Sequence, residues 1–170
     1  KQDEEREKKW KEYSSIYNQY VDFYHGEILK NEDSKFAREY LKKRNLTKNE
    51  VLKFKIGHVK EKPNFYQTLK DQFSDESLIE SGLFYFDEKN KTYVERFRNR
   101  IIFPINNISG QPIALGGRTF EDKSFLAKYI NSPETLFFKK GFNLYNLDYA
   151  RRLSNKIDHI FLVEGYMDVI

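Results

Sequence analysis

A carboxylate that follows an apolar run is the first feature of this chain that could do chemistry. The run spans Ile160–Val163, and Glu164, Gly165 and Asp168 come directly after it. The apolar run predicts a buried strand, and open α/β sheets place their reacting groups at the carboxyl ends of their strands. Gly165 allows the backbone to turn sharply and to approach a ligand closely. Because many strands end in an acid and a glycine, the pattern needs support from the rest of the chain.

A local excess of positive charge precedes this acid. The chain has a net charge of +4, from 30 basic and 26 acidic side chains. Residues 89–141 alone carry ten basic and four acidic side chains, an excess of six positive charges. Such a segment is typical of a surface that faces a polyanion. A solvated basic face would give the same count, so the charge alone does not decide between the two interpretations.

Arginines stand at every second position from residue 96 to residue 100. The stretch reads Arg96, Phe97, Arg98, Asn99, Arg100. If it is extended, the three guanidinium groups share one face and can grip a row of phosphates bidentately. The alternative is a strand edge that its charges protect against pairing with another chain.

Two glycines precede another arginine. Gly116 and Gly117 lie at the end of a predicted strand and Arg118 follows them. The missing β-carbons allow a backbone or a nucleotide to come close while the arginine supplies charge. Taken alone, these three residues usually indicate only a bulge or a turn.

Two further stretches combine the groups that nucleic acids contact. Lys128, Tyr129 and Asn131 offer a cation, an aromatic ring and an amide, which suit phosphate, base and sugar, although a strand before an ordinary turn is the simpler interpretation. Lys140 lies in a Lys-Lys-Gly stretch that lacks the spaced glycines of a Walker loop. We therefore reject an ATPase interpretation.

The elements that must position these residues begin with helices. An aromatic stripe at spacings of three and four runs from Trp10 to Ile28 and predicts a helix with one buried face. The other helices are expected from Ser34 to about Leu41 with Asn45 as a left-handed cap, after the capping-box pattern Thr47–Glu50, from Pro63 through Phe65 and Leu69, over residues 75–81 before Gly82, and after Asn146.

Strands dominate the second half of the chain. They are expected at Lys55–Val59, in a hairpin formed by Leu83–Phe86 and Thr92–Val94, at Arg100–Ile105 and Pro112–Leu115 around a turn at 106–110, and at Ile160–Val163. Helices followed by strands predict an α+β fold. We expect residues 1–12 to be a linker or a solvated helix start, residues 13–157 to form one subdomain, and residues 158–170 to begin another.

Composition narrows the class of protein. Aromatic residues make up 16% of the chain, which is enough to build a core. Cysteine is absent, so neither a disulfide nor a cysteine zinc site can form from these residues. No apolar run reaches the length of a membrane span.

As an ordered set, these stretches resemble the catalytic core of bacterial replicative primases of the DnaG type. The resemblance covers roughly residues 16–170 and is carried by residues 40–46, 54–57, 96–105, 116–118, 128–135, 138–141, 144–145 and 164–168. It implies a helical N-terminal part, then a subdomain with a mixed or antiparallel sheet, and finally the first strand of a Toprim α/β domain. Asn45 stands where the family commonly has glycine, and asparagine tolerates the same left-handed conformation.

The resemblance also implies an activity and its residues. In that family such cores synthesise short RNA primers on a single-stranded DNA template from ribonucleoside triphosphates. Glu164 matches the first Toprim acid, a metal ligand or general base working with Mg²⁺ or Mn²⁺, and Asp168 matches a second metal-site acid. The positions that would face template, nucleotide and primer are Arg44, Arg96, Arg98, Arg118, Lys128, Tyr129, Asn131 and Lys140.

The resemblance is to part of a longer protein. The family's later Asp-x-Asp pair, its N-terminal Zn²⁺-binding domain and its C-terminal domain, which contacts the replicative helicase, have no counterpart in this sequence. The resemblance implies a cytoplasmic, nucleoid-associated protein of the bacterial replication fork with no membrane partner. The fragment itself is expected to be inactive. Two other interpretations remain: a non-catalytic module that binds single-stranded nucleic acid, and a structural α+β domain with a solvated basic face.

Overall fold

The computed structural model describes residues 2–121 and 127–170. Asp122 and Lys123, which contribute to the charge count above, lie outside the described residues. The helices are α1 (Gln2–Lys30), α2 (Lys35–Lys43), α3 (Lys48–Lys53), α4 (Phe65–Lys70), α5 (Asp75–Glu80), α6 (Leu147–Arg152) and α7 (Tyr166–Val169), with short 3₁₀ helices η1 (Glu32–Ser34), η2 (Lys140–Phe142) and η3 (Ser154–Lys156). The strands are β1 (Gly57–Val59), β2 (Phe84–Asp87), β3 (Thr92–Glu95), β4 (Arg100–Asn106), β5 (Pro112–Arg118) and β6 (Tyr129–Asn131).

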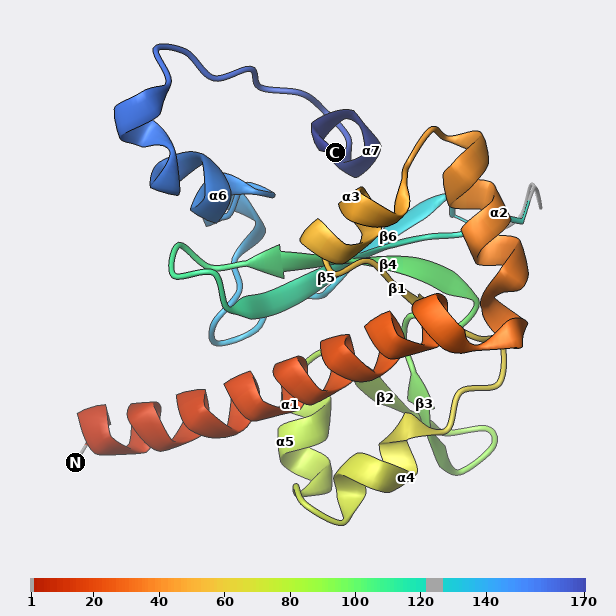
Figure 1. The fold of residues 1–170 in the computed structure, drawn as a ribbon. Coiled ribbons are helices and arrows are strands. Elements are labelled where there is room, and N and C mark those ends of the chain that lie inside the picture. Colours follow the sequence, from red (N-terminus) through yellow and green to blue (C-terminus); the bar gives the residue numbers. More distant parts are fainter. Residues whose placement is uncertain (1, 122–126) are drawn as a thin grey trace.

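The strands form two antiparallel sheets. The larger has the order β1-β4-β5-β6, and the smaller is the hairpin of β2 and β3. Helix α1 runs along one face of the larger sheet, with α4, α5 and the small hairpin on its far side, while α3 and α7 lie on the opposite face of that sheet (Figure 1). The predicted helical N-terminal part followed by antiparallel sheets is therefore confirmed. In the part of the chain described, no helix is both long and apolar enough to cross a membrane.

Alternation along β4 divides the core between the two faces of the larger sheet. Ile102 packs into the core beneath α1, while its neighbours Ile101 and Phe103 pack into a second cluster with residues of α2 and α3. A strand points successive side chains to opposite faces, so an apolar run is required where both faces are covered. This second face is the one that carries the site described below.

The aromatic stripe of α1 is confirmed as core. Tyr17, Tyr20 and Tyr24 are buried, and Ile16, which the stripe omitted, is buried with them. The hydroxyl of Tyr17 donates to the Ser81 carbonyl at 2.9 Å, so the ring reaches the end of α5 without leaving its polar atom unpaired. Tyr24 likewise donates to Glu95 Oε2 at 2.5 Å, so both rings combine a large apolar contact with a satisfied polar end, whereas the buried Tyr20 hydroxyl has no partner among the described residues.

The structure confirms several of the signals that the sequence gives for the ends of helices. Thr47 and Glu50 form the predicted capping box at the start of α3. Asn45 has φ 62°, the left-handed conformation expected after α2, and Gly82, expected to end the helix before it, has φ 77°. Two details differ: α4 begins at Phe65 rather than at Pro63, and Asn146 precedes α6 without a capping bond from its side chain.

The predicted strand at Ile160–Val163 is not formed in this structure. The segment is an irregular stretch outside both sheets, and its four side chains are 41% to 82% exposed. A strand requires a neighbour that accepts and donates its backbone hydrogen bonds. Among the described strands none pairs with this segment, and an apolar composition cannot supply the missing partner.

The prediction that Arg96, Arg98 and Arg100 lie on one face is also wrong. Residues 96–99 form turns, and β4 begins only at Arg100. Asn99 has φ 56°, which interrupts any extended run, and the Phe97 side chain is fully buried in the core. The demand of the core for Phe97 and the left-handed turn at Asn99 together separate the three guanidinium groups.

Candidate nucleic-acid and nucleotide groove

A groove of about 700 Å³ lies between the β5–β6 edge of the larger sheet and the C-terminal segment. Its walls come from the end of α2, the ends of β5 and β6, residues 143–147 and residues 160–169. Six of the residues proposed from the sequence line this one hollow: Arg44, Arg118, Tyr129, Asn131, Glu164 and Asp168. Side chains from distant parts of the sequence therefore meet beside Glu164.

Arg118 is the central cation of this groove. Its guanidinium carbon lies 5.1 Å from the ring centre of Tyr40 and 5.0 Å from that of Tyr129, and it donates a hydrogen bond to the Tyr129 hydroxyl. It makes no ion pair within the described residues, and its buried Nε has no partner there. Two aromatic rings thus orient a largely buried guanidinium that forms no ion pair with a carboxylate of residues 2–121 or 127–170, an arrangement that favours an anionic ligand.

Arg44 approaches the same tyrosine from the end of α2. Its Nε donates to the Tyr40 hydroxyl at 3.1 Å, and its guanidinium carbon lies 5.7 Å from that ring. The spacing of four places Tyr40 and Arg44 on one side of the helix. Tyr40 therefore contacts both arginines and draws their charges together.

Asn131 is held by a residue of the C-terminal segment. Its Oδ1 accepts a hydrogen bond of 2.5 Å from the Tyr166 hydroxyl. The Tyr166 ring stacks on Phe103 at 5.4 Å with an interplanar angle of 3°, and it meets the Tyr145 ring edge-on at 4.9 Å. Burial, and to a smaller extent Tyr129, raises the pKa of Tyr166 to about 12, so its hydroxyl remains a donor at neutral pH.

The two adjacent glycines are explained by aromatic side chains of this chain. A β-carbon on Gly116 would lie 2.4 Å from the Tyr166 ring, and one on Gly117 would lie 2.6 Å from the Phe97 ring. The groups that come close to these glycines are protein rings, and not the backbone or nucleotide that was expected. Arg118 follows them because the same strand, β5, ends at the groove.

Glu164 and Asp168 are exposed carboxylates on the wall formed by the C-terminal segment. Gly165 caps α7, and a β-carbon there would lie 2.8 Å from Asp168 Oδ2, so the turn brings Asp168 back against residue 165. Mg²⁺ accepts one or two carboxylates together with water and substrate phosphates, so these two oxygen donors fit it. No group of three or more His, Cys, Asp or Glu side chains suited to a metal occurs in the described residues.

The other four proposed nucleic-acid residues do not line the groove. Arg96 donates from Nε to the Gly82 carbonyl at 2.8 Å, and Arg98 is exposed in the turn before β4. Lys128 is exposed just before β6, and Lys140 begins η2, where its backbone N–H bonds Glu134 Oε1 at 3.1 Å. The basic residues of the second half of the chain thus divide between the groove and other surfaces.

Sequence reasoning overlooked the aromatic residues that organise the groove. The sequence assigns no role to Tyr40, Tyr145 or Tyr166. In the structure Tyr40 contacts two of the proposed cations, and Tyr166 donates a hydrogen bond to the proposed amide residue. The spacing of Tyr40 and Arg44 on one helix was a usable signal. Nothing in the sequence pairs Tyr40 with Arg118, because only the fold brings them together.

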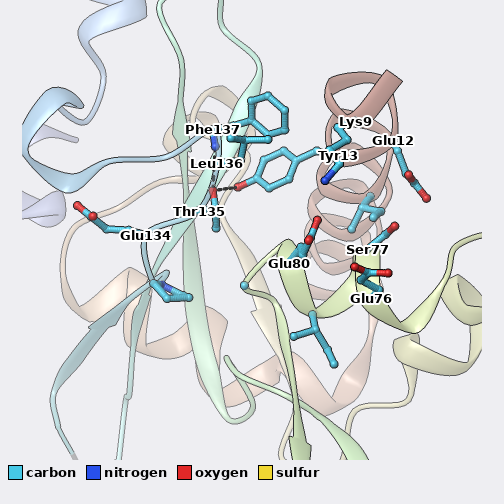
Figure 2. Close-up of a pocket in the computed structure, with 14 residues that line it drawn as sticks. Lys9, Glu12, Tyr13, Glu76, Ser77, Glu80, Glu134, Thr135, Leu136 and Phe137 are labelled. Carbon is cyan, nitrogen blue, oxygen red and sulfur yellow. Dashed lines mark hydrogen bonds between the residues drawn. The ribbon is translucent and has the colours of Figure 1, made fainter. Parts of the chain in front are cut away.

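A different hollow is lined by carboxylates. It lies where α1, α5 and residues 133–137 meet and has a volume of about 590 Å³, and its lining includes Tyr13 and Thr135, which are hydrogen-bonded to each other (Figure 2). Glu12, Glu76 and Glu80 project around it (Figure 2). Their charge opposes phosphate, so the groove beside Arg118 is the better candidate for a polyanion.

Comparisons with known proteins show the family of the chain. The family model "DNA primase catalytic core, N-terminal domain" matches residues 23–151. The DNA primase of Staphylococcus epidermidis is 40% identical over 151 residues, which cover 88% of this chain and 25% of that protein. The DNA primase of Lactococcus lactis is 38% identical over 157 residues, covering 91% and 24%. The chain spans about a quarter of the length of these relatives.

Solved structures of primase cores share the fold. A DNA primase domain from Pseudomonas aeruginosa matches with a TM-score of 0.83 and 34% identity over 92% of this chain and 49% of that chain. A DnaG primase catalytic domain bound to single-stranded DNA matches with a TM-score of 0.80 and 32% identity over 95% and 50%. Because the family model and these relatives cover most of its residues, the chain belongs to the DnaG family of DNA primases and corresponds to the N-terminal domain of the catalytic core.

Proposed function

We propose that this chain forms the template- and nucleotide-facing wall of a primase core that synthesises short RNA primers on single-stranded DNA. The observation that carries the proposal is the convergence of Arg44, Arg118, Tyr129 and Asn131 on the groove that Glu164 also lines. Proteins usually hold a single strand with cations that bind the backbone phosphates. Neighbouring aromatic rings and amides contact the bases and sugars. The relative with bound single-stranded DNA supports the same choice of ligand.

Each side chain has a separate task in this proposal. Arg118, oriented by Tyr40 and Tyr129, binds a phosphate of the strand or of a ribonucleoside triphosphate through its planar donors. Arg44 binds a neighbouring phosphate, and Tyr129 offers a ring on which a base can stack. Orientation of the reacting strands by such contacts lowers the barrier to nucleotidyl transfer without any change in the chemistry itself.

We assign Glu164 to the catalytic centre, as a metal ligand or general base, with Asp168 as a further metal ligand. Mg²⁺ or Mn²⁺ bound there would activate a 3′-hydroxyl and neutralise the charge of the leaving pyrophosphate. In a complete primase that contains this sequence, Glu164→Gln should abolish primer synthesis while single-stranded DNA binding is retained. Primer synthesis at an undiminished rate would refute the assignment. Zn²⁺ and the replicative helicase belong, in this proposal, to other domains of such a protein.

A second candidate function is specific to these 170 residues: a single-stranded nucleic-acid-binding module without catalysis. It is favoured by the groove's small set of acids, because the described residues hold no cluster of three metal-binding side chains. Primer synthesis by the isolated chain would contradict this candidate. Binding without synthesis would support it and leaves the proposed role within a complete primase intact.

The binding test uses the 170-residue chain and a fluorescein-labelled oligodeoxythymidylate. Affinity should fall between about 50 mM and about 200 mM salt, because binding releases counterions from the phosphates. Arg118→Gln should weaken binding and reduce the slope of log K against log salt by about 0.7, the share of one phosphate contact on a single strand. Arg6→Gln removes the same charge from an exposed position on α1 and is the matched control. Equal effects of the two substitutions would refute the groove as the binding site.

A further inference from the structure

A third hollow, of about 610 Å³, is apolar and lies on the helical side of the molecule. It is bounded by the last turns of α1, by α2 and by the start of α3. Ile28, Leu41 and Val51 line it as members of the second core cluster, and Leu29 and Leu46 line it as partly buried side chains. The buried Ile28, Leu41 and Val51 thus form the floor of one hollow, and the partly exposed Leu29 and Leu46 add apolar surface that a ligand can reach.

Positive charges border this apolar groove. Arg38, Lys42 and Lys48 line it, and none of its lining residues is acidic. Lys42 and Lys48 are exposed and make no ion pair with any described residue. Arg38 donates from Nη1 to the carbonyls of Ile28 at 3.1 Å and Asn31 at 2.7 Å, which fixes its guanidinium near the end of α1.

The spacing of these charges indicates the shape of a ligand. Arg38 and Lys42 are four residues apart on α2, so they lie one turn, about 6 Å, apart along the helix. Leu41 lies between them in sequence and on the same side of α2, facing the apolar floor. A helix with a stripe of aliphatic side chains and acids one turn apart on its flank would match both the floor and the rim.

We propose that this groove is a docking site for an acidic amphipathic helix of a partner protein. Nucleic acid is a poorer fit, because none of the lining residues carries an aromatic ring on which a base could stack, and of the two uncharged polar lining residues, Asn45 and Thr47, the second is engaged in the capping box of α3. Tyr40 and Arg44, which serve the nucleic-acid groove, occupy another side of α2. A helix bound here would therefore lie behind the DNA-binding residues and contact the element that carries them.

The test measures binding of designed peptides to the complete 170-residue chain by fluorescence anisotropy. The probe is a fluorescein-labelled helix of about four turns with leucines at i, i+4 and i+7 and glutamates one turn apart on their flank. Saturable binding tighter than about 1 mM is expected. A Lys42→Glu, Lys48→Glu double variant should bind this peptide about tenfold more weakly than the parent chain does. The same double variant should bind a peptide with lysines in place of the glutamates more tightly than the parent chain does.

Controls separate this site from non-specific attraction. The Lys62→Glu, Lys70→Glu double variant changes the same net charge at exposed positions elsewhere and should alter peptide affinity less than about twofold. Leu46→Ser should weaken binding of the peptide and leave binding of oligodeoxythymidylate unchanged. Equal binding of the acidic and basic peptides, or equal loss in both double variants, would overturn the proposal. So would binding of oleate at the groove with no binding of the acidic peptide.

Discussion

The ring of Tyr166 occupies the space that a side chain at Gly116 would need. A β-carbon on Gly116 would lie 2.4 Å from Cε2 and Cζ of that ring. The ring is otherwise held by its stack on Phe103 and its hydrogen bond to Asn131. The space at Gly116 therefore accommodates Tyr166, two residues after Glu164, and the contact ties the acidic segment to β5, the strand that also carries Arg118.

Gly116→Ala should displace Tyr166 from this seat. We expect the unfolding free energy to fall by about 1–3 kcal/mol, the usual cost of forcing a group into a packed site. We also expect faster proteolysis after residue 160, because α7 loses its main contact with the sheet. Urea unfolding and timed digestion followed by mass spectrometry measure the two effects.

The matched control for this substitution is Gly141→Ala, because nothing lies within 4 Å of a β-carbon at residue 141. It should leave both measurements close to those of the parent chain. If Gly116→Ala behaves in the same way as Gly141→Ala, Tyr166 does not depend on Gly116 for its position.

Arg118→Lys keeps the charge but not the planar group between Tyr40 and Tyr129. Because an ammonium neither stacks on rings nor binds phosphate bidentately, single-stranded DNA affinity should fall about tenfold. The salt dependence should remain that of the parent, since one positive charge is still present. Fluorescence anisotropy over a salt series measures both quantities, and full retention of affinity would show that the rings do not orient the cation for binding.

His58 should make the fold sensitive to acid. Burial, with a further contribution from Arg38, lowers the pKa of His58 to about 4, and its Nδ1 lies 2.8 Å from Ser34 Oγ. A folded pKa below the ordinary 6.5 contributes stability that is present above pH 6.5 and lost as the pH falls toward 4, by up to about 3 kcal/mol. His58→Gln should therefore lose less stability than the parent between pH 7 and pH 4. Parallel urea-unfolding curves for the two proteins would contradict this assignment.

Two glycine substitutions near the contact between α1 and the sheet should change the unfolding free energy in opposite directions. Gly26 lies inside α1 with open space around its α-carbon, so Gly26→Ala should raise the unfolding free energy by about 0.5–1 kcal/mol. A β-carbon on Gly57 would lie 3.0 Å from both the Tyr24 backbone and Ile102, so Gly57→Ala should lower it. Thermal unfolding of both variants measures the difference, and destabilisation by Gly26→Ala would contradict the position of α1.

Local patterns allowed the sequence to predict much of the fold. The α1 stripe, the capping box at Thr47 and the left-handed Asn45 depend on residues within a few positions of one another. Such features are decided by the backbone's own hydrogen bonds and by helical periodicity. The hairpin of β2 and β3 and the turn between β4 and β5 were predicted for the same reason.

The errors arose where distant contacts decide the outcome. The prediction that Arg96, Arg98 and Arg100 share one face assumed an extended backbone. Burial of Phe97 and the left-handed conformation of Asn99 prevent that extension. Arg100 instead donates to backbone carbonyls, including that of Ala127 at 2.8 Å. The unpaired stretch Ile160–Val163 shows the same limit, because its strand prediction depended on partners that composition does not reveal.

The most direct test of the central claim is photocross-linking of 4-thiothymidine-containing single-stranded DNA to the chain, with the linked residues mapped by mass spectrometry. If the groove beside Arg118 holds the strand, cross-links should fall on the groove rings, Tyr129 first, and should diminish in Arg118→Gln. Cross-links confined to the turn around Arg98 or to the segment around Lys140, with none in the groove, would contradict the account.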